Sequence, residues 1–187
     1  MKDKAAPSFC LAAFLILLVF PGVACKGKHT PAVVQPAVVQ NEEPDQAPRL
    51  VSSVRMNDTT AALQLLNGFY PVESGAWRWT AGKFSVLLRT PPGSAQRGAT
   101  LNFAFTIPEV VIQKLNSMQL TASINGMDLK SDEYKKPGPE TFSADVPGSL
   151  LTPDSVKIDF ALDKSLPPGL DKRELGVVAF LAALTPK

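Results

Sequence analysis

From residue 50 onward, short apolar runs alternate with clusters of turn-forming residues, and this pattern constrains the fold more than any other feature of the chain. In residues 156–162 every second side chain is apolar, which gives a strand one face for a core and one face for water. The chain also contains 17 prolines and 12 glycines, which favour turns and disfavour long helices. The sequence therefore predicts a β-structure built from short antiparallel strands.

The predicted strands end at Pro, Gly, Asn or Asp residues. They cover residues 77–80, 84–89, 100–106, 120–124, 127–129, 141–146, 156–162 and 174–181. The dipeptide Asn125-Gly126 is typical of a two-residue hairpin turn between two of them. About eight strands at this spacing predict an all-β domain, an antiparallel, jelly-roll-like β-sandwich, over residues 50–187.

One segment carries a helical pattern instead. Residues 108–115 begin with a proline and place apolar side chains three and four residues apart, which predicts a single short helix. Residues 59–66 fit either a helical turn or a strand.

The first 24 residues have the three parts of a signal peptide. A start with two lysines precedes an apolar stretch at residues 5–20, and small residues at 22–24 lead to Cys25. The stretch is shorter than the roughly 20 residues that a membrane-spanning helix needs. Residues 22–25 resemble the bacterial lipobox, with Gly22 where leucine is usual, and this resemblance implies cleavage before Cys25 and acylation of that cysteine. Secretion without a lipid and an uncleaved anchor are the alternatives.

Residues 25–49 read as a low-complexity tether. The sequence PAVVQ occurs there twice, at residues 31–35 and 36–40, and repeated prolines keep such a segment extended. The chain thus divides into a signal peptide (1–24), a lipid-anchored tether (25–49) and a sandwich domain (50–187). Lys26 after the acylated cysteine resembles the pattern of lipoproteins sorted to the outer membrane of a two-membrane cell, facing the periplasm or the surface.

Several kinds of chemistry lack the residues they need. The only histidine, His29, lies in the tether, and the only cysteine left after cleavage is Cys25, so a Ser–His–Asp triad, a cysteine nucleophile and a zinc site are not expected. A net charge of +2 without a basic stripe argues against nucleic acid as a partner. No cofactor, metal or enzymatic activity is predicted. A loop calcium site and a pair of catalytic carboxylates stay open, the latter among Glu73, Asp128, Asp132, Glu133, Glu140, Asp163, Asp171 and Glu174.

An aromatic cluster stands out within residues 67–80. It contains Tyr70 and both tryptophans, Trp77 and Trp79. Because the tryptophans are two residues apart, a strand would place them on the same face. They predict either core packing or a flat platform on which sugar rings stack, and the three aromatic residues are the candidate ligand-binding residues.

Charged residues in two distant stretches are candidates for a structural network. Arg78 would point away from the tryptophans, toward Glu73, and Asp171, Arg173 and Glu174 precede the last predicted strand. Contacts between these two groups would tie the two stretches together.

The same two stretches resemble a bacterial β-sandwich domain found in lipoproteins and alongside glycosyltransferases. The matching residues are Gly68, Phe69, Tyr70, Glu73, Arg78, Trp79, Asp171, Arg173, Glu174, Leu175 and Gly176. The resemblance covers roughly residues 50–184 and implies a sandwich fold, but it brings no established activity. It associates the domain with surface glycans.

These observations predict a lipid-anchored module of the cell envelope that binds a glycan or an envelope polymer without catalysis. The alternative is a structural or protein-interaction lipoprotein of the envelope. The two hypotheses differ in whether Trp77 and Trp79 are exposed.

Overall fold

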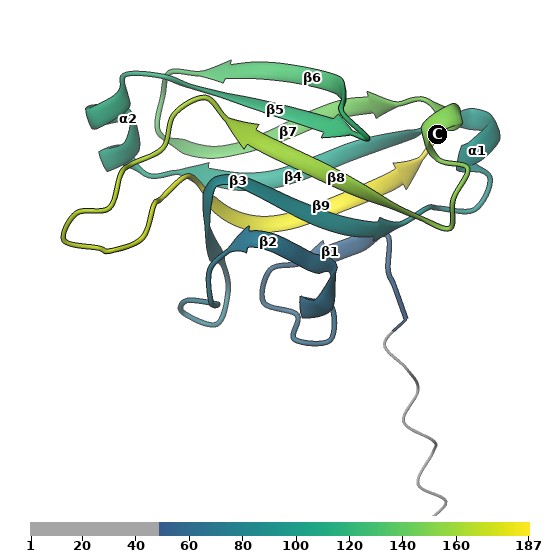
Figure 1. The fold of residues 1–187 in the computed structure, drawn as a ribbon, viewed down its shortest axis with the longest axis horizontal. Helices are drawn as coiled ribbons and strands as arrows, with labels where there is room; N and C mark the ends of the chain where they lie inside the picture. Colours follow the sequence, from purple (N-terminus) through teal and green to yellow (C-terminus); the bar gives the residue numbers. More distant parts are fainter. Residues whose placement is uncertain (1–48) are drawn as a thin grey trace, which may run out of the picture. The chain divides into compact units, whose positions relative to one another are not determined.

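The computed structural model describes residues 49–187 (Figure 1). The predicted signal peptide, Cys25 and the tether up to residue 48 lie outside the described residues. None of the described helices is long and apolar enough to cross a membrane.

Within residues 49–187 the chain forms nine strands and a few short helical segments. The strands are β1 (Ser53–Arg55), β2 (Leu65–Phe69), β3 (Arg78–Arg89), β4 (Ala99–Ile107), β5 (Met118–Ile124), β6 (Met127–Tyr134), β7 (Gly138–Val146), β8 (Ser155–Leu162) and β9 (Val178–Pro186). The helical segments are α1 (Ser94–Arg97), α2 (Glu109–Leu115) and the 3-10 turns η1 (Ala62–Gln64) and η2 (Gly148–Leu150).

The strands form two antiparallel sheets that pack as a β-sandwich (Figure 1). Sheet I contains β7, β4 and β9 in that order, and both β1 and the first residues of β3 pair with the other edge of β9. Sheet II contains β6, β5, β8, β3 and β2 in that order. After the β5–β6 hairpin the chain passes to sheet I with β7, to sheet II with β8 and back to sheet I with β9, which is a jelly-roll pattern. The predicted fold class is therefore confirmed.

Phenylalanine rings from both sheets meet in the middle of the sandwich. The Phe160 ring of β8 stacks on Phe84 of β3 at a centroid distance of 5.0 Å and lies 4.8 Å from Phe103 of β4. Phe142 of β7 meets the Phe160 ring edge to face at 6.4 Å. All four side chains are buried, so burial of their rings is a main source of the stability of the fold.

Strand β3 belongs to both sheets. Arg78 and Trp79 pair with β9 of sheet I, whereas residues 83–89 pair with β8 of sheet II. The sequence predicted two strands here, at residues 77–80 and 84–89, and the structure joins them because the backbone stays extended through the buried Gly82. A Cβ at Gly82 would lie 2.5 Å from Glu174 Oε1, so a larger residue would displace the Glu174 side chain where the strand passes between the sheets.

The last strand begins four residues later than predicted. Residues 163–177 form a long loop in which Leu166 and Leu175 exchange backbone hydrogen bonds of 2.8 and 3.0 Å. The Gly176 N–H donates to the carbonyl of Thr80 at 2.7 Å. Residues 174–177 are therefore held by the loop and by β3, and β9 starts only at Val178.

The predicted helix and two further segments can be compared directly with the structure. The predicted helix is confirmed as α2, with Pro108 immediately before its first residue. Residues 59–66 contain both of the expected alternatives, since η1 leads directly into β2. The strand predicted at 127–129 continues to Tyr134 as β6.

Candidate functional site

Strand β3 places both tryptophans on the outside of the sandwich. Its even-numbered residues from Thr80 to Leu88 are buried, so its odd-numbered residues face outward. Trp77 precedes the strand and Trp79 lies within it; both side chains are half-buried. Their ring centroids are 6.4 Å apart and the ring planes meet at 80°, which is a favourable edge-to-face contact.

Tyr70 joins the tryptophans from the neighbouring strand. The Tyr70 N–H donates to the carbonyl of Trp79 at 3.0 Å, immediately beyond the pair formed by Phe69 and Thr80. Phe69 points inward against the Phe84 ring, so Tyr70 faces outward like Trp79. The structure thus brings the three predicted ligand-binding residues, Tyr70, Trp77 and Trp79, into one group, here called the aromatic cluster.

The geometry of the aromatic cluster corrects the expected flat platform. Two indole planes at 80° do not lie in one plane, so a sugar ring stacks on one of them at a time. Trp79 also packs against the edge of the hydrophobic core, whereas Trp77 is not among the residues packed there.

Arg78 holds the backbone beneath the aromatic cluster. Its Nε donates to the carbonyl of Met56 at 2.7 Å and its Nη1 donates to the carbonyl of Tyr70 at 3.0 Å. The expected pairing of Arg78 with Glu73 is wrong, because the Arg78 guanidinium donates to these two backbone carbonyls and Glu73 pairs with another arginine. Arg78 fixes the end of β1 and the start of the β2–β3 loop.

Glu73 pairs instead with Arg173, a hundred residues further along the chain. Arg173 Nη1 lies 2.8 Å from Glu73 Oε1, and Arg173 Nη2 lies 2.7 Å from Asp171 Oδ2. The Arg173 guanidinium also lies over the Tyr70 ring, 5.1 Å from its centroid, which is a cation–π contact. We call this group of Glu73, Asp171, Arg173 and Tyr70 the Arg173 bridge; it joins the β2–β3 loop to the β8–β9 loop.

The Arg173 bridge shifts the pKa values of Asp171 and Arg173. Hydrogen bonds from the Arg173 side chain and backbone lower the pKa of Asp171 to about 2. The side-chain hydrogen bond to Asp171 and the hydrogen bond to Glu73 raise the pKa of Arg173 above its usual range. Asp171 and Arg173 therefore stay charged throughout the physiological pH range.

Glu174 lies outside the Arg173 bridge, although the sequence grouped it there. Its carboxylate accepts a 2.5 Å hydrogen bond from the Ser165 hydroxyl and lies beside Gly82. The residue closes the β8–β9 loop against β3. It has a structural contact, but not the one expected from its position beside Arg173.

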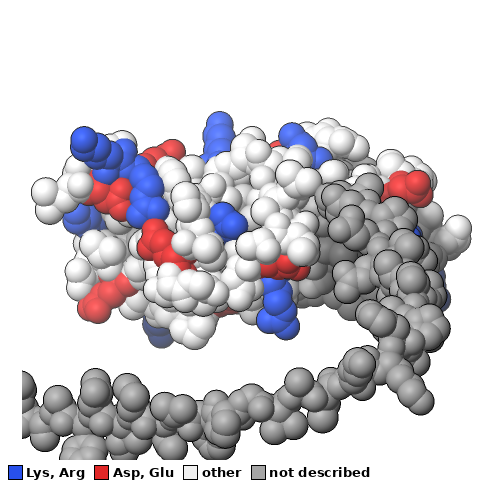
Figure 2. Space-filling model, turned by 90° about the horizontal axis from the view of Figure 1, so that it is seen from below, with Lys and Arg blue, Asp and Glu red and all other residues white. Residues whose placement is uncertain are grey.

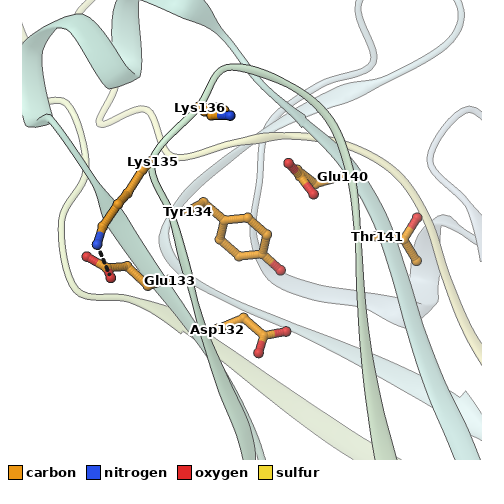
Figure 3. A pocket seen from close by; sticks show the side chains of 7 residues that line it. All are labelled: Asp132, Glu133, Tyr134, Lys135, Lys136, Glu140 and Thr141. Carbon is orange, nitrogen blue, oxygen red and sulfur yellow. Dashed lines mark ion pairs between the residues drawn. The ribbon is translucent and has the colours of Figure 1, made fainter.

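A second candidate region, at the edge of the sandwich, was not predicted. It is a hollow of about 530 Å³ between the end of β6 and the start of β7, here called the edge hollow (Figure 3). Its lining residues are Asp132, Glu133, Tyr134, Lys135, Lys136, Glu140 and Thr141. In Figure 3 the Tyr134 ring lies between the Asp132 and Glu140 carboxylates. Tyr134 stands among charged residues in the sequence, and no local pattern there indicates a site.

Tyr134 is well suited to donate a hydrogen bond. Its ring packs edge to face on Phe105 at 5.3 Å, and burial raises the pKa of Tyr134 above its usual value. The negative charges of Asp132 and Glu140 add to this rise in pKa. The phenol therefore stays protonated at any physiological pH.

The surface charges are mixed. On the face shown in Figure 2, basic and acidic side chains are interspersed among uncharged ones. Across residues 49–187 no group of three or more His, Cys, Asp or Glu side chains is arranged to hold a metal ion.

Comparison with known proteins gives distant likenesses only. No protein-family model matches the sequence, and no curated protein sequence matches it significantly. Solved structures similar to it include an acetyl xylan esterase, Est2A, from Butyrivibrio proteoclasticus, at 11% identity and a TM-score of 0.40 over 73% of this chain and 32% of the esterase. The carbohydrate-binding module CsCBM6-3 from Clostridium stercorarium, solved with cellobiose, has 11% identity and a TM-score of 0.40 over 73% of this chain and 95% of the module. The mannan-recognising module TmCBM27 has 10% identity and a TM-score of 0.40 over 74% and 98%.

The match to the esterase spans about a third of that protein's length. The sandwich architecture of the present chain rests on its own strand pairing, and its possible ligands rest on the residues of its surface.

Proposed function

We propose that this protein is a lipid-anchored, non-catalytic module of the bacterial cell envelope that binds a glycan through the aromatic cluster. The observation that supports the proposal most directly is the outward orientation of Tyr70, Trp77 and Trp79 on two paired strands. Aromatic faces stack on the apolar C–H faces of sugar rings, and ring contacts contribute strongly to binding for the area they occupy. The predicted acylation of Cys25 would tether such a module at a membrane.

The Arg173 bridge supports the same proposal. Carboxylate and guanidinium groups beside aromatic rings suit hydroxyl groups, because they offer several acceptors and donors in fixed directions. Glu73, Asp171 and Arg173 each keep about a third of their side-chain surface exposed. Since they already hold one another in place, little conformational entropy is lost when a ligand binds.

A structural or protein-interaction lipoprotein is the second candidate. The observation in its favour is the packing of Trp79 against the core, together with an Arg173 bridge that ties two loops. On this hypothesis the cluster would stabilise the sandwich or contact an envelope protein.

Tryptophan fluorescence distinguishes the two candidates, because the chain has only two tryptophans and they touch. We would record the emission and its quenching by iodide in the intact protein in detergent, and titrate oligosaccharides and envelope polymers. We expect red-shifted, quenchable emission that responds to a saccharide. We also expect Trp77→Ala to weaken that binding about tenfold or more.

Leu63→Ala is the matched control, because Leu63 is 74% exposed and lies in η1. It is expected to leave the affinity unchanged. Blue-shifted emission that neither iodide nor any glycan alters would instead favour the structural candidate.

A further inference from the structure

The strand register places the aromatic cluster in a row that crosses the whole of sheet I. Trp79 pairs with Val178 of β9, Val178 pairs with Thr106 of β4, and Thr106 pairs with Pro139 of β7. Tyr70 adds the fifth position through its hydrogen bond to Trp79. Residues directly opposite one another in paired strands face the same side of a sheet. The row of five positions spans four strand spacings, or roughly 19 Å, and within it only Val178, at 8% exposure, is buried.

The outer face of sheet I is hollowed beside this row. A depression of about 400 Å³, here called the face hollow, lies over β4, β7 and β9. Phe180 lines it and is 38% exposed, in the bulge where β9 shifts register against β4. The small side chain of Ala104 at the centre of the same face leaves the space above the sheet open.

The face hollow and the edge hollow lie on opposite sides of β7. Glu140 and Thr141 line both depressions, but Glu140 pairs with the buried Phe105, whereas Thr141 pairs with the outward Ala104. Tyr134, which packs on Phe105, therefore belongs to the edge hollow and not to the outer face. On the outer face, aromatic rings stand at one end, in the aromatic cluster, and in the middle, at Phe180.

The middle of the surface is polar but uncharged. The outward side chains of β4 are Thr100, Asn102, Ala104 and Thr106, which alternate with its buried residues. Asn102 and Ser143 of β7 already hydrogen-bond across the face, with the Ser143 hydroxyl donating at 3.1 Å. Neutral hydroxyl and amide groups beside aromatic rings suit a ligand that is itself neutral and rich in hydroxyl groups.

We infer that the outer face of sheet I is one continuous binding surface for an extended, neutral glycan chain, with Phe180 as a stacking residue beyond the aromatic cluster. The inference rests on the proposed function and names the class of ligand. A chain of several sugars would lie across β3, β9, β4 and β7. A single sugar would occupy only the aromatic cluster.

The test uses the intact protein in detergent and isothermal titration with neutral β-1,4-linked glucose, mannose and N-acetylglucosamine ladders, from the disaccharide to the hexasaccharide. The affinity is expected to rise with chain length for one of the ladders. Phe180→Ala should weaken the longest chain about tenfold and leave the disaccharide unchanged. Ala104→Gln should have the same selective effect, because it fills the face hollow.

Ala161→Gln is the matched control, since Ala161 has an equivalent outward, half-buried position on β8 of sheet II. It should leave every affinity unchanged. An affinity independent of chain length, or a long-chain affinity that Phe180→Ala and Ala104→Gln leave intact while Trp77→Ala abolishes it, would overturn the continuous surface and leave the proposed function standing. Failure of the wild-type protein to bind any ladder or envelope polymer would overturn both.

Discussion

Arg173 shows how one residue organises the candidate site. Its guanidinium contacts two carboxylates and the face of Tyr70 at once. Each of these ion pairs is partly exposed, so each contributes little to stability. Their combined effect is geometric, because a planar guanidinium held at three points fixes the orientation of the Tyr70 ring.

The pKa of Asp171 tests the Arg173 bridge directly. We expect the Asp171 carboxyl to titrate with a pKa of about 2, below its ordinary value of 3.8. Because the folded-state pKa is lowered, the ionised carboxylate favours the folded loop at pH values above 3.8. That contribution is lost as the pH falls from 3.8 to about 2. Carboxyl-carbon NMR of Asp171 against pH measures the midpoint.

The control for this titration is Arg173→Met. It should return the pKa of Asp171 toward its ordinary value while leaving that of Asp58 lowered, since Thr60 causes the Asp58 shift. A midpoint near 3.8 in the unaltered protein would show that the bridge does not form in solution.

Most secondary-structure elements were predictable because their determinants are local. The alternation in residues 156–162 and the turn at Asn125-Gly126 each lie within one segment, and the structure confirms both. The sequence did not predict that residues 77–80 and 84–89 belong to a single strand, β3. Ala81-Gly82-Lys83 interrupts the apolar pattern, and the strand runs through this segment because β9 pairs with its beginning and β8 with the rest.

The candidate site was predictable in its members but not in its pairings. The spacing of Trp77 and Trp79 placed them on one face without reference to the rest of the fold. The partner of Glu73 lies a hundred residues away, where no local pattern points to it. Arg78 is much closer to Glu73 in the sequence, but its side chain points inward from β3 and donates to backbone carbonyls.

Strand β2 contains a glycine whose replacement tests the β2–β3 pairing. Gly68 has a φ of +71°, and a Cβ there would contact the Lys83 carbonyl and lie 2.6 Å from Phe84 Cα. We expect Gly68→Ala to lower the free energy of unfolding by at least about 2 kcal/mol more than a glycine-to-alanine change at an open turn. Urea denaturation measures the difference.

Gly126→Ala provides that comparison. Gly126 has a similar φ of +78° but no atom within 4 Å of its Cβ position, so the variant experiences the backbone strain without the collision. Equal losses of stability in the two variants would mean that β2 does not pack on β3 as described.

At the scale of the whole molecule, the proposed binding surface lies apart from the residues that stabilise the fold. The phenylalanine core between the sheets holds the fold, while the outer face of sheet I carries mainly small, uncharged and aromatic side chains, with Arg55 of β1 at its edge. A jelly roll brings β3, β9, β4 and β7 side by side although they are distant in sequence. This arrangement explains how residues from 70 to 180 contribute to one surface.

The membrane tether proposed for the whole protein depends on a single cysteine, and the chain supplies its own control. The chain has two cysteines, Cys10 and Cys25, of which the first lies within the predicted signal peptide and would be removed with it. We expect a palmitate analogue to label the protein in a bacterial host and the labelled protein to sediment with membranes. Cys25→Ser should abolish the label and release the domain from the membrane fraction, because the remaining chain would have no acyl group to insert. Cys10→Ser should leave both label and sedimentation intact, and labelling that survives Cys25→Ser would refute the anchor at this residue.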